Sequence, residues 1–260
     1  MSAPMSGLRT ARYAVVGMPV AHSLSPVMQQ AAFHAAGLHA TYEAIESDVA
    51  QAPELFDRLR AAGYAGWNVT TPLKDAAFSL VDQVSDEARA ARAVNAVRND
   101  KDGTLQGHET DGLGLVQALV ELWSWDPYAG TALVLGAGPA ARAAIESLRT
   151  VGATVSCWAR DAERAARLAP PIADRPALVV SALAPDATVP DFILRAADDD
   201  TMIFDCNYGR DGSPVAAMRG RRRTNGLPLL LHQGALSFTW WTGKAAPLDA
   251  MRAALEAHRR

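Results

Sequence analysis

The amino-acid sequence predicts an α/β protein of two lobes, and three observations support this class. Short apolar runs alternate with helical stretches along the chain, which is typical of βαβ units. One of these runs ends directly in a glycine-rich turn that opens a helix, as in a doubly wound parallel sheet of the Rossmann type. The length of 260 residues is enough for one large domain or two modest ones. We therefore expect an α/β lobe joined to a Rossmann-type lobe.

The N-terminal half contains the elements of the first lobe, after a disordered tail of about eleven residues. Pro26 opens the first helix and Gly37 closes it, because proline favours the first helical turn and glycine the position after the last. The segment Thr41–Ile45 alternates in polarity as a strand does. The expected order is a strand at 13–17, a helix from 26 to about 37, a strand at 41–45, a helix at about 53–62, a strand ending at 68–70, helices near 76–81 and 86–91, and a hairpin at 96–106.

The C-terminal half contains the second lobe and a helical end. A helix follows Asp111, and its apolar residues lead into the first strand of the second lobe. The expected order is that helix, a strand at 131–135, a helix from 139 to about 151, strands at 153–158, 178–180 and 202–204, and helices near 229–241 and 248–258. The boundary between the lobes falls near Asp111, and a cleft between the lobes is expected to hold the chemistry.

The glycine-rich turn follows the almost wholly apolar run Thr131–Leu135, which predicts a strand buried on both faces. The pattern is G-x-G-x-x-A. Its first glycine permits a tight turn, its second lets a phosphate approach the backbone, and its alanine allows close helix packing. Free amides and the helix dipole then favour a pyrophosphate. The predicted dinucleotide-binding residues of this turn are Gly136, Ala137, Gly138, Pro139 and Ala140.

The end of the next strand indicates which dinucleotide binds. NAD sites usually have an acidic residue there, whereas NADP sites have arginine for the extra phosphate. Arg160 and Arg164 have the guanidinium geometry that suits this phosphate, which favours NADP over NAD. Asp161 lies between them and has two interpretations, since it can cap the following helix or bond a ribose. A further alternative is that both arginines only solvate the start of a helix.

Composition and charge indicate a globular protein of the cytoplasm. The chain is 49% hydrophobic and 20% charged, and its net charge of −3 gives no reason to expect nucleic acid or an anionic membrane as partner. The short basic cluster from Arg219 to Arg223 predicts a solvated loop or helix end. Cys157 and Cys206 have no metal-binding or redox spacing, so we expect reduced thiols and no metal. No signal peptide and no membrane-spanning run is expected.

Lys74 and Asp111 supply a cation and a carboxylate upstream of the glycine-rich turn. An ammonium group can stabilise negative charge on a carbonyl oxygen during reduction and donate a proton to it, and a carboxylate can orient that ammonium. Together with a nicotinamide dinucleotide, this pair predicts a dehydrogenase. The alternative is structural: Lys74 is a surface residue of a helix, and Asp111 is the N-cap of a helix that starts at Gly112.

Seven segments resemble the shikimate dehydrogenase family, in that family's order and over nearly the whole chain. They are residues 17–26, 68–74, 93–95, 110–112, the glycine-rich turn, 205–208 and 232–235. The resemblance implies reversible NADPH-dependent reduction of 3-dehydroshikimate to shikimate, a step of aromatic amino acid biosynthesis. It also implies a discontinuous substrate-binding domain, residues 1–110 and 226–260, and an NADP-binding Rossmann domain at 111–225. We expect a monomer or a homodimer.

The same resemblance implies a role for individual residues. The substrate carboxylate is expected to bind Ser23, Ser25 and Tyr208. The ring hydroxyls are expected to bind Thr70, Asn95 and Gln233, together with Asp111. Lys74 and Asp111 match the catalytic pair of the family. A site of fixed hydrogen-bond partners rejects analogues that leave those partners unpaired.

Three departures from the family pattern leave alternatives open. Glu109 replaces the usual asparagine before Thr110-Asp111, and it adds a charge near the catalytic pocket if it points inward. Ala159-Arg160-Asp161 replaces Asn-Arg-Thr, and Ser181-Ala182-Leu183 stands where Asn-Ala-Thr is common. The alternatives are a quinate or aminoshikimate dehydrogenase, with NAD as its cofactor in one version, and a catalytically inactive protein that senses a metabolite.

Overall fold

The computed structural model describes residues 10–208 and 212–258. Most of the expected N-terminal tail lies outside these residues, and the first strand begins at Ala11. The chain forms two compact units, which confirms an α/β fold of two lobes. The first unit runs to Val84 and includes Val94–His108 and the chain from Gly234 onward, and the second unit comprises Ser85–Ala93 and Glu109–Gln233.

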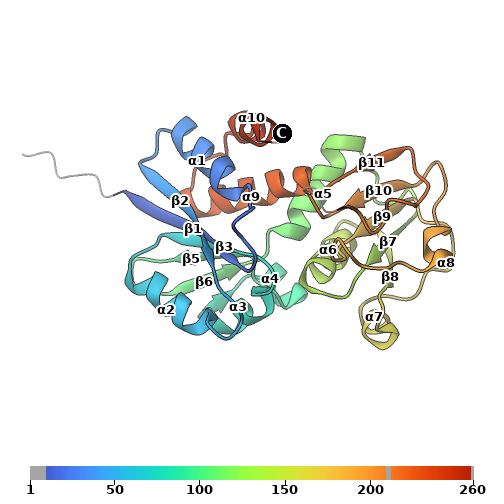
Figure 1. The fold of residues 1–260 in the computed structure, drawn as a ribbon, viewed down its shortest axis with the longest axis horizontal. Helices are drawn as coiled ribbons and strands as arrows, with labels where there is room; N and C mark the ends of the chain where they lie inside the picture. Colours follow the sequence, from blue (N-terminus) through green and yellow to red (C-terminus); the bar gives the residue numbers. More distant parts are fainter. Residues whose placement is uncertain (1–9, 209–211, 259–260) are drawn as a thin grey trace, which may run out of the picture. The chain divides into compact units, whose positions relative to one another are not determined.

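The first unit contains a six-stranded sheet in the order β2-β1-β3-β5-β6-β4 (Figure 1). Strand β5 is antiparallel to both of its neighbours, which confirms the expected hairpin, and all other pairs are parallel. The two-residue strand β4 was not predicted from the sequence, because its pairing with β6 needs no apolar pattern of its own. The strands are β1 (Ala11–Gly17), β2 (Ala40–Glu46), β3 (Gly66–Val69), β4 (Gln83–Val84), β5 (Ala96–Asn99) and β6 (Leu105–His108).

Helices of the first unit bury an aromatic core against its sheet. The Phe33 ring stacks on Tyr13 of β1 at 4.8 Å between centroids and lies 5.5 Å from the ring of Phe238. Trp241 lies 5.1 Å from Tyr13, and its indole nitrogen donates to the carbonyl of Val97 at 2.9 Å. Helix α10 packs beside α1 (Figure 1). The helices are α1 (Ser25–Ala35), α2 (Ala52–Ala61), α3 (Lys74–Leu80) and α10 (Leu248–Ala257), and α9 (Leu227–Thr242) begins in the second unit and continues into the first.

The second unit contains a five-stranded, wholly parallel sheet in the order β11-β10-β9-β7-β8 (Figure 1). The prediction of a loop or helix end over the basic cluster was wrong at Arg222 and Arg223, which lie in the edge strand β11. An edge strand pairs through its backbone, so its side chains can stay charged and exposed. The strands are β7 (Thr131–Leu135), β8 (Thr154–Trp158), β9 (Leu178–Ser181), β10 (Met202–Asp205) and β11 (Arg222–Thr224).

Both faces of this parallel sheet are buried, as the continuous apolar runs of its strands predict. Val134 points into one apolar cluster, which includes Leu119 and Ile145 of the helices on that face. Leu133 points into a second cluster with Ile193 and Met218. The sheet is therefore doubly wound. The helices of this unit are α4 (Asp86–Ala91), α5 (Asp111–Trp123), α6 (Pro139–Thr150), α7 (Ala162–Leu168) and α8 (Asp191–Leu194).

Each sheet has one point at which the strand order reverses. In the first unit β1 lies between β2 and β3, and in the second unit β7 lies between β8 and β9. The connections that leave the two sides of the central strand go to opposite faces of the sheet, which opens a crevice at the carboxyl ends of these strands. These two reversal points are where the fold alone predicts ligand binding.

Candidate active site

The reversal point of the first unit joins two of the segments singled out in the sequence. The amide of Met18 donates to the carbonyl of Thr71 at 2.9 Å, and the amide of Thr70 donates to Val16 at 2.9 Å. A Cβ on Gly17 would lie 2.4 Å from Cγ2 of Thr70, so only glycine allows this approach. The loops that carry the two predicted serines and Lys74 therefore start side by side.

Ser23 and Ser25 lie at the N-terminus of α1. Helix α1 begins at Ser25, one residue before the expected start at Pro26, and no side chain of the N-cap residue Leu24 caps it. The hydroxyl oxygen of Ser23 accepts a hydrogen bond from the amide of Ser25 at 3.2 Å. Because amides and the dipole at a helix N-terminus favour an anion, this place suits a carboxylate.

Lys74, Thr70 and Asn95 are held together by backbone hydrogen bonds. Lys74 is the first residue of α3 and is half-buried. The carbonyl of Lys74 accepts from the amide of Val94 at 3.1 Å. Asn95, which follows Val94, accepts through its own carbonyl from the amide of Val69 at 2.8 Å, and Val69 directly precedes Thr70. The side chain of Asn95 is buried. Thus the structure brings together three of the predicted residues of this unit at the reversal point.

Asn68 is a polar residue of this site that the sequence reasoning did not single out. It lies on β3, is buried, and accepts from the hydroxyl of Tyr42 at 2.7 Å. Its amide nitrogen donates to the carbonyl of Asn95 at 3.1 Å and to the hydroxyl of Ser237 at 2.9 Å. An asparagine inside an apolar strand is the sequence signal that would have found it, because buried polar groups need partners.

The glycine-rich turn lies at the reversal point of the second unit, after β7. Gly136 has φ +119°, and a Cβ there would lie 3.0 Å from the carbonyl oxygen of Ala182. Its amide donates to Trp158 at 2.8 Å, and its carbonyl accepts from the thiol of Cys157 at 3.4 Å. Burial raises the pKa of this thiol to about 11, so the thiol remains a donor at neutral pH.

Gly138 is the N-cap of α6, and the turn is open at this position. No side chain caps α6, and a Cβ on Gly138 would meet nothing within 4 Å. Pro139 occupies the first turn and Ala141 is fully buried, as the pattern predicts. The start of α6 is therefore open next to Gly138, and a helix N-terminus of this kind favours an anion such as a pyrophosphate.

One of the two interpretations of Asp161, the helix cap, is seen in the structure, and its predicted bond to a ribose stays a prediction. Asp161 is the N-cap of α7, and its carboxylate accepts from the amide of Arg164 at 2.9 Å. The guanidinium groups of Arg160 and Arg164 are exposed, and neither forms an ion pair or hydrogen bond with the described residues. At the end of β8 the chain thus presents two available cations and a carboxylate that is already used as a cap.

Asp111 lies at the start of α5, but it is not the N-cap that the structural alternative expected. Thr110 is the N-cap residue, and Asp111 is the first helical residue. The carboxylate of Glu109 binds the start of the helix, with one oxygen 2.9 Å from the amide of Asp111 and the other 2.9 Å from the amide of Gly112.

Gln233 approaches the first turn of α5 within the second unit. A Cβ on Gly114 would lie 2.6 Å from the backbone nitrogen of Gln233, so the two helices are in backbone contact there. Asp111 and Gly114 share a face of α5, because they are three residues apart. One residue before Gln233, the imidazole of His232 lies 2.6 Å from the carboxylate of Glu121 on α5. The structure therefore brings Asp111 and Gln233 to one region.

Tyr208 belongs to a different unit from Ser23 and Ser25, the two serines with which it is predicted to bind the substrate carboxylate. It follows β10 in the second unit and is half-buried, whereas Ser23 and Ser25 belong to the first unit. The preceding Asn207 is fixed by Asp205, whose carboxylate accepts from its amide at 3.1 Å and from its side chain at 2.9 Å.

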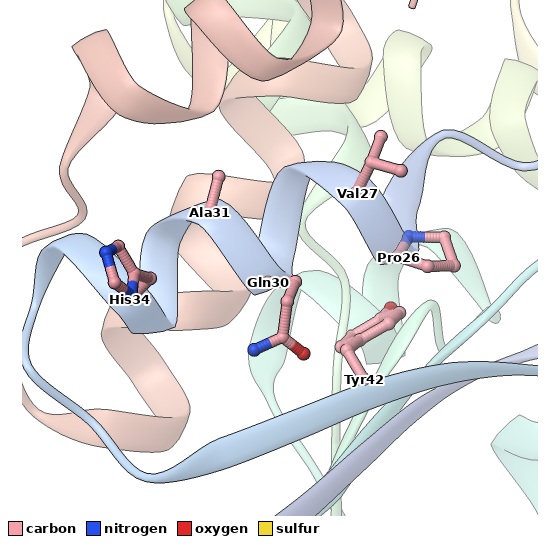
Figure 2. Close-up of a pocket in the computed structure, with 6 residues that line it drawn as sticks. All are labelled: Pro26, Val27, Gln30, Ala31, His34 and Tyr42. Atoms are coloured by element: carbon pink, nitrogen blue, oxygen red, sulfur yellow. The ribbon is translucent and has the colours of Figure 1, made fainter.

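A groove on the first unit contains none of the predicted site residues in its lining, although Pro26 directly follows Ser25 and the Tyr42 hydroxyl donates to Asn68. It has a volume of about 610 Å³ and runs along the exposed side of α1 and the edge strand β2 (Figure 2). Its lining residues are Pro26, Val27, Gln30, Ala31, His34 and Tyr42. Among the described residues there is no cluster of three or more potential metal ligands, and no helix in that part of the chain is long and apolar enough to cross a membrane.

Comparison with known protein families gives two matches. Residues 15–97 match the shikimate dehydrogenase substrate binding domain, and residues 226–256 match the shikimate 5'-dehydrogenase C-terminal domain. A shikimate dehydrogenase (NADP(+)) from Thermus thermophilus is 37% identical over 89% of this chain and 92% of its own length. One from an Anaeromyxobacter species is 37% identical over 97% of this chain and 98% of its own length.

Solved structures of shikimate dehydrogenases have the same fold. The enzyme from Aquifex aeolicus superposes with a TM-score of 0.87 at 31% identity and covers 96% of this chain and 99% of its own. The enzyme from Thermus thermophilus in complex with NADP(H) and shikimate has a TM-score of 0.85 at 34% identity, with coverage of 95% and 99%. Identity above 30% over most of both chains leads to one conclusion: this chain belongs to the shikimate dehydrogenase family.

Proposed function

We propose that this protein is an NADP-dependent shikimate dehydrogenase that interconverts 3-dehydroshikimate and shikimate in aromatic amino acid biosynthesis. The observation that carries the proposal is the second unit's open glycine turn, followed at the end of β8 by two available arginines. Curated relatives over nearly the full length are NADP(+) enzymes of this name. We expect a cytoplasmic enzyme that is active as a monomer or a homodimer.

The cofactor is held, in this proposal, by the second unit. The amides of Ala137, Gly138 and Ala140 and the dipole of α6 bind the pyrophosphate, because Gly138 leaves room for it. Pro139 has no amide hydrogen and contributes only its backbone geometry. Arg160 and Arg164 bind the 2′-phosphate. Asp161 caps α7 through one carboxylate oxygen, and in this proposal its other oxygen accepts a hydrogen bond from a ribose hydroxyl of the cofactor. When bound, the reduced cofactor supplies a hydride.

The substrate is recognised by hydroxyl and amide groups. Ser23, Ser25 and Tyr208 bind its carboxylate, and the start of α1 adds the favourable field of a helix N-terminus. Thr70, Asn95 and Gln233 bind its ring hydroxyls. Substrate binding is assigned to residues 1–110 and 226–260 and NADP binding to residues 111–225, with Asp111 acting on the substrate from the start of α5.

Lys74 and Asp111 carry the proton chemistry. As the ketone is reduced, negative charge builds on its oxygen, and the ammonium of Lys74 stabilises this charge and donates a proton. Asp111 orients the ammonium and accepts a hydrogen bond from the neighbouring ring hydroxyl. In the reverse direction Lys74 takes the proton back from the hydroxyl of shikimate. The half-buried position of Lys74 at the start of α3 limits the number of its conformations.

The test is product formation in both directions by purified protein. With shikimate and NADP, we expect NADPH and 3-dehydroshikimate to appear in equal amounts, and with 3-dehydroshikimate and NADPH we expect the reverse. Folded protein that binds NADP but converts neither substrate would refute the proposal and favour a metabolite-sensing protein.

A further inference from the structure

Glu109 is a buried carboxylate directly before the start of α5. Only 2% of its surface is exposed, and it has both oxygens on backbone amides, those of Asp111 and Gly112, at 2.9 Å each. The first amides of a helix have no partner inside the helix. The usual cap is a side chain of the N-cap residue itself, yet the N-cap here, Thr110, makes no capping bond. Glu109 performs this task from one residue further out.

The first turn of α5 is also confined on two other sides. A Cβ on Gly112 would lie 2.2 Å from the hydroxyl of Ser147 and 2.4 Å from the carbonyl of Ala143, both on α6. A Cβ on Gly114 would collide with the backbone of Gln233 on α9. The turn that begins with Asp111 is therefore pressed between two helices, and its N-terminal peptide groups are fixed by Glu109.

We propose that Glu109 is a positioning residue for Asp111. Its two oxygens fix the peptide groups on either side of the Asp111 Cα, and this sets the direction of the Asp111 side chain. Because Glu109 accepts from the first two amides of α5, these amides are capped without the carboxylate of Asp111. The inference rests on the proposed function, in which Asp111 orients Lys74. Displacing a reacting group by about 1 Å can cost about 100-fold in rate.

A double-mutant cycle tests this role. Glu109→Ala removes both acceptors, and we expect kcat for shikimate oxidation to fall about 100-fold. Glu109→Gln keeps the size and one acceptor, so we expect a smaller loss, of about tenfold. The Kd for NADPH, measured by fluorescence, should change by less than about threefold in both variants, since the two amides that Glu109 binds belong to α5 and not to the glycine turn. In an Asp111→Asn background, Glu109→Ala should lower kcat by less than about threefold, because its partner in function is already lost.

A matched control separates positioning from stability. Ser85 caps α4 in the same unit, where its hydroxyl accepts from the amide of Ala88 at 3.2 Å. Ser85→Ala should lower the melting temperature and leave kcat within about twofold. If Glu109→Ala does not fold, the same double-mutant cycle is measured with Glu109→Gln in its place. The inference would be overturned if a Glu109 substitution lowered kcat by the same factor in the wild-type and Asp111→Asn backgrounds. It would also be overturned if Glu109→Ala kept an undiminished kcat.

A second readout does not depend on activity. The amides of Asp111 and Gly112 should exchange slowly with solvent in the wild type, and Glu109→Gln should speed the exchange of at least one of them while leaving the rest of α5 unchanged. A wild type that does not oxidise shikimate would refute the proposed function alone. Unchanged exchange at both amides would refute the positioning role whatever the substrate.

Discussion

At the scale of single residues, the first unit's polar site depends on side chains that have several partners each. Asn68 accepts from Tyr42 and donates to Asn95 and Ser237, so it links two strands and α9 from a buried position. Lys74, by contrast, is fixed through its backbone, and its side chain extends from the start of α3. We therefore expect substitution of Lys74 to affect mainly turnover and substitution of Asn68 to affect stability and substrate binding.

Lys74→Ala should lower kcat for shikimate oxidation by about 100-fold or more and change KM much less. The ammonium acts on charge that develops in the transition state, so its loss affects turnover more than binding. Steady-state kinetics measure both constants, with Lys101→Ala as the control, since Lys101 is exposed in a turn outside the site. A variant with undiminished kcat would remove Lys74 from the mechanism.

Asn68→Ala should destabilise the protein by about 1–3 kcal/mol and raise KM for shikimate. The change removes one buried hydrogen bond each from the Tyr42 hydroxyl, the Ser237 hydroxyl and the carbonyl of Asn95. Urea unfolding measures the stability. Asn99→Ala is the control, because Asn99 lies on β5 of the same sheet and donates to the carbonyls of Arg60 and Tyr64. Its loss should cost stability without a change in KM. Equal KM values in the two variants would contradict a role of Asn68 in the site.

At the scale of elements, we propose that the end of β8 and the two ends of the glycine turn determine cofactor binding. The turn combines Gly136, which the backbone requires, with Gly138, where the protein itself leaves room for a side chain and the proposed pyrophosphate would need that room. The end of β8 combines a carboxylate that caps α7 with two exposed arginines. In each case, a substitution that should impair cofactor binding can be compared with a nearby substitution that should not impair it in the same way.

Gly138→Ala should leave the free energy of unfolding unchanged within about 0.5 kcal/mol and raise KM for NADP strongly. A Cβ there meets no protein atom, but it occupies the space of the proposed pyrophosphate. Gly136→Ala should instead destabilise the protein by about 1–3 kcal/mol, because the residue has a positive φ and faces Ala182. Thermal unfolding and cofactor titration of both variants check this, and similar behaviour of the two would contradict the interpretation.

Replacing Arg160 and Arg164 together by alanine should raise KM for NADP by about tenfold or more and leave KM for NAD unchanged. Charge-assisted contacts to the 2′-phosphate are lost, and NAD has no such phosphate. Arg167→Ala is the control, since Arg167 lies on α7 and pairs with Glu163. A parallel change for both cofactors would show that the arginines do not select the phosphate.

At the scale of the whole molecule, sequence predicted the classes of both sheets and nearly every long element, because apolar period, proline and glycine act locally. It did not show that Ser85–Ala93 belongs to the second unit. That placement depends on Arg142, which donates to the carbonyls of Ala91 and Arg92 from about fifty residues away in the chain. The sequence also did not predict that Glu109 caps α5, because the usual capping side chain belongs to the N-cap residue itself, which is Thr110 here.

The residues of the proposed site also differ in how far local sequence predicts them. Residues within one local motif, such as Gly136 and Pro139, take the positions that the pattern predicts. Residues whose roles come from separate segments were named through the family resemblance, and physical chemistry alone would not have paired Asp111 with Gln233. Their proximity arises from Gly114, whose missing Cβ allows α5 and α9 to meet.

The most direct test of the central claim is the initial rate of shikimate oxidation by the purified protein, with NADP and NAD tested separately and quinate as a competing substrate. We predict a higher kcat/KM with NADP than with NAD, and little turnover of quinate. A preference for NAD or for quinate, from protein that is folded and binds dinucleotide, would contradict the account and favour a related dehydrogenase of different specificity.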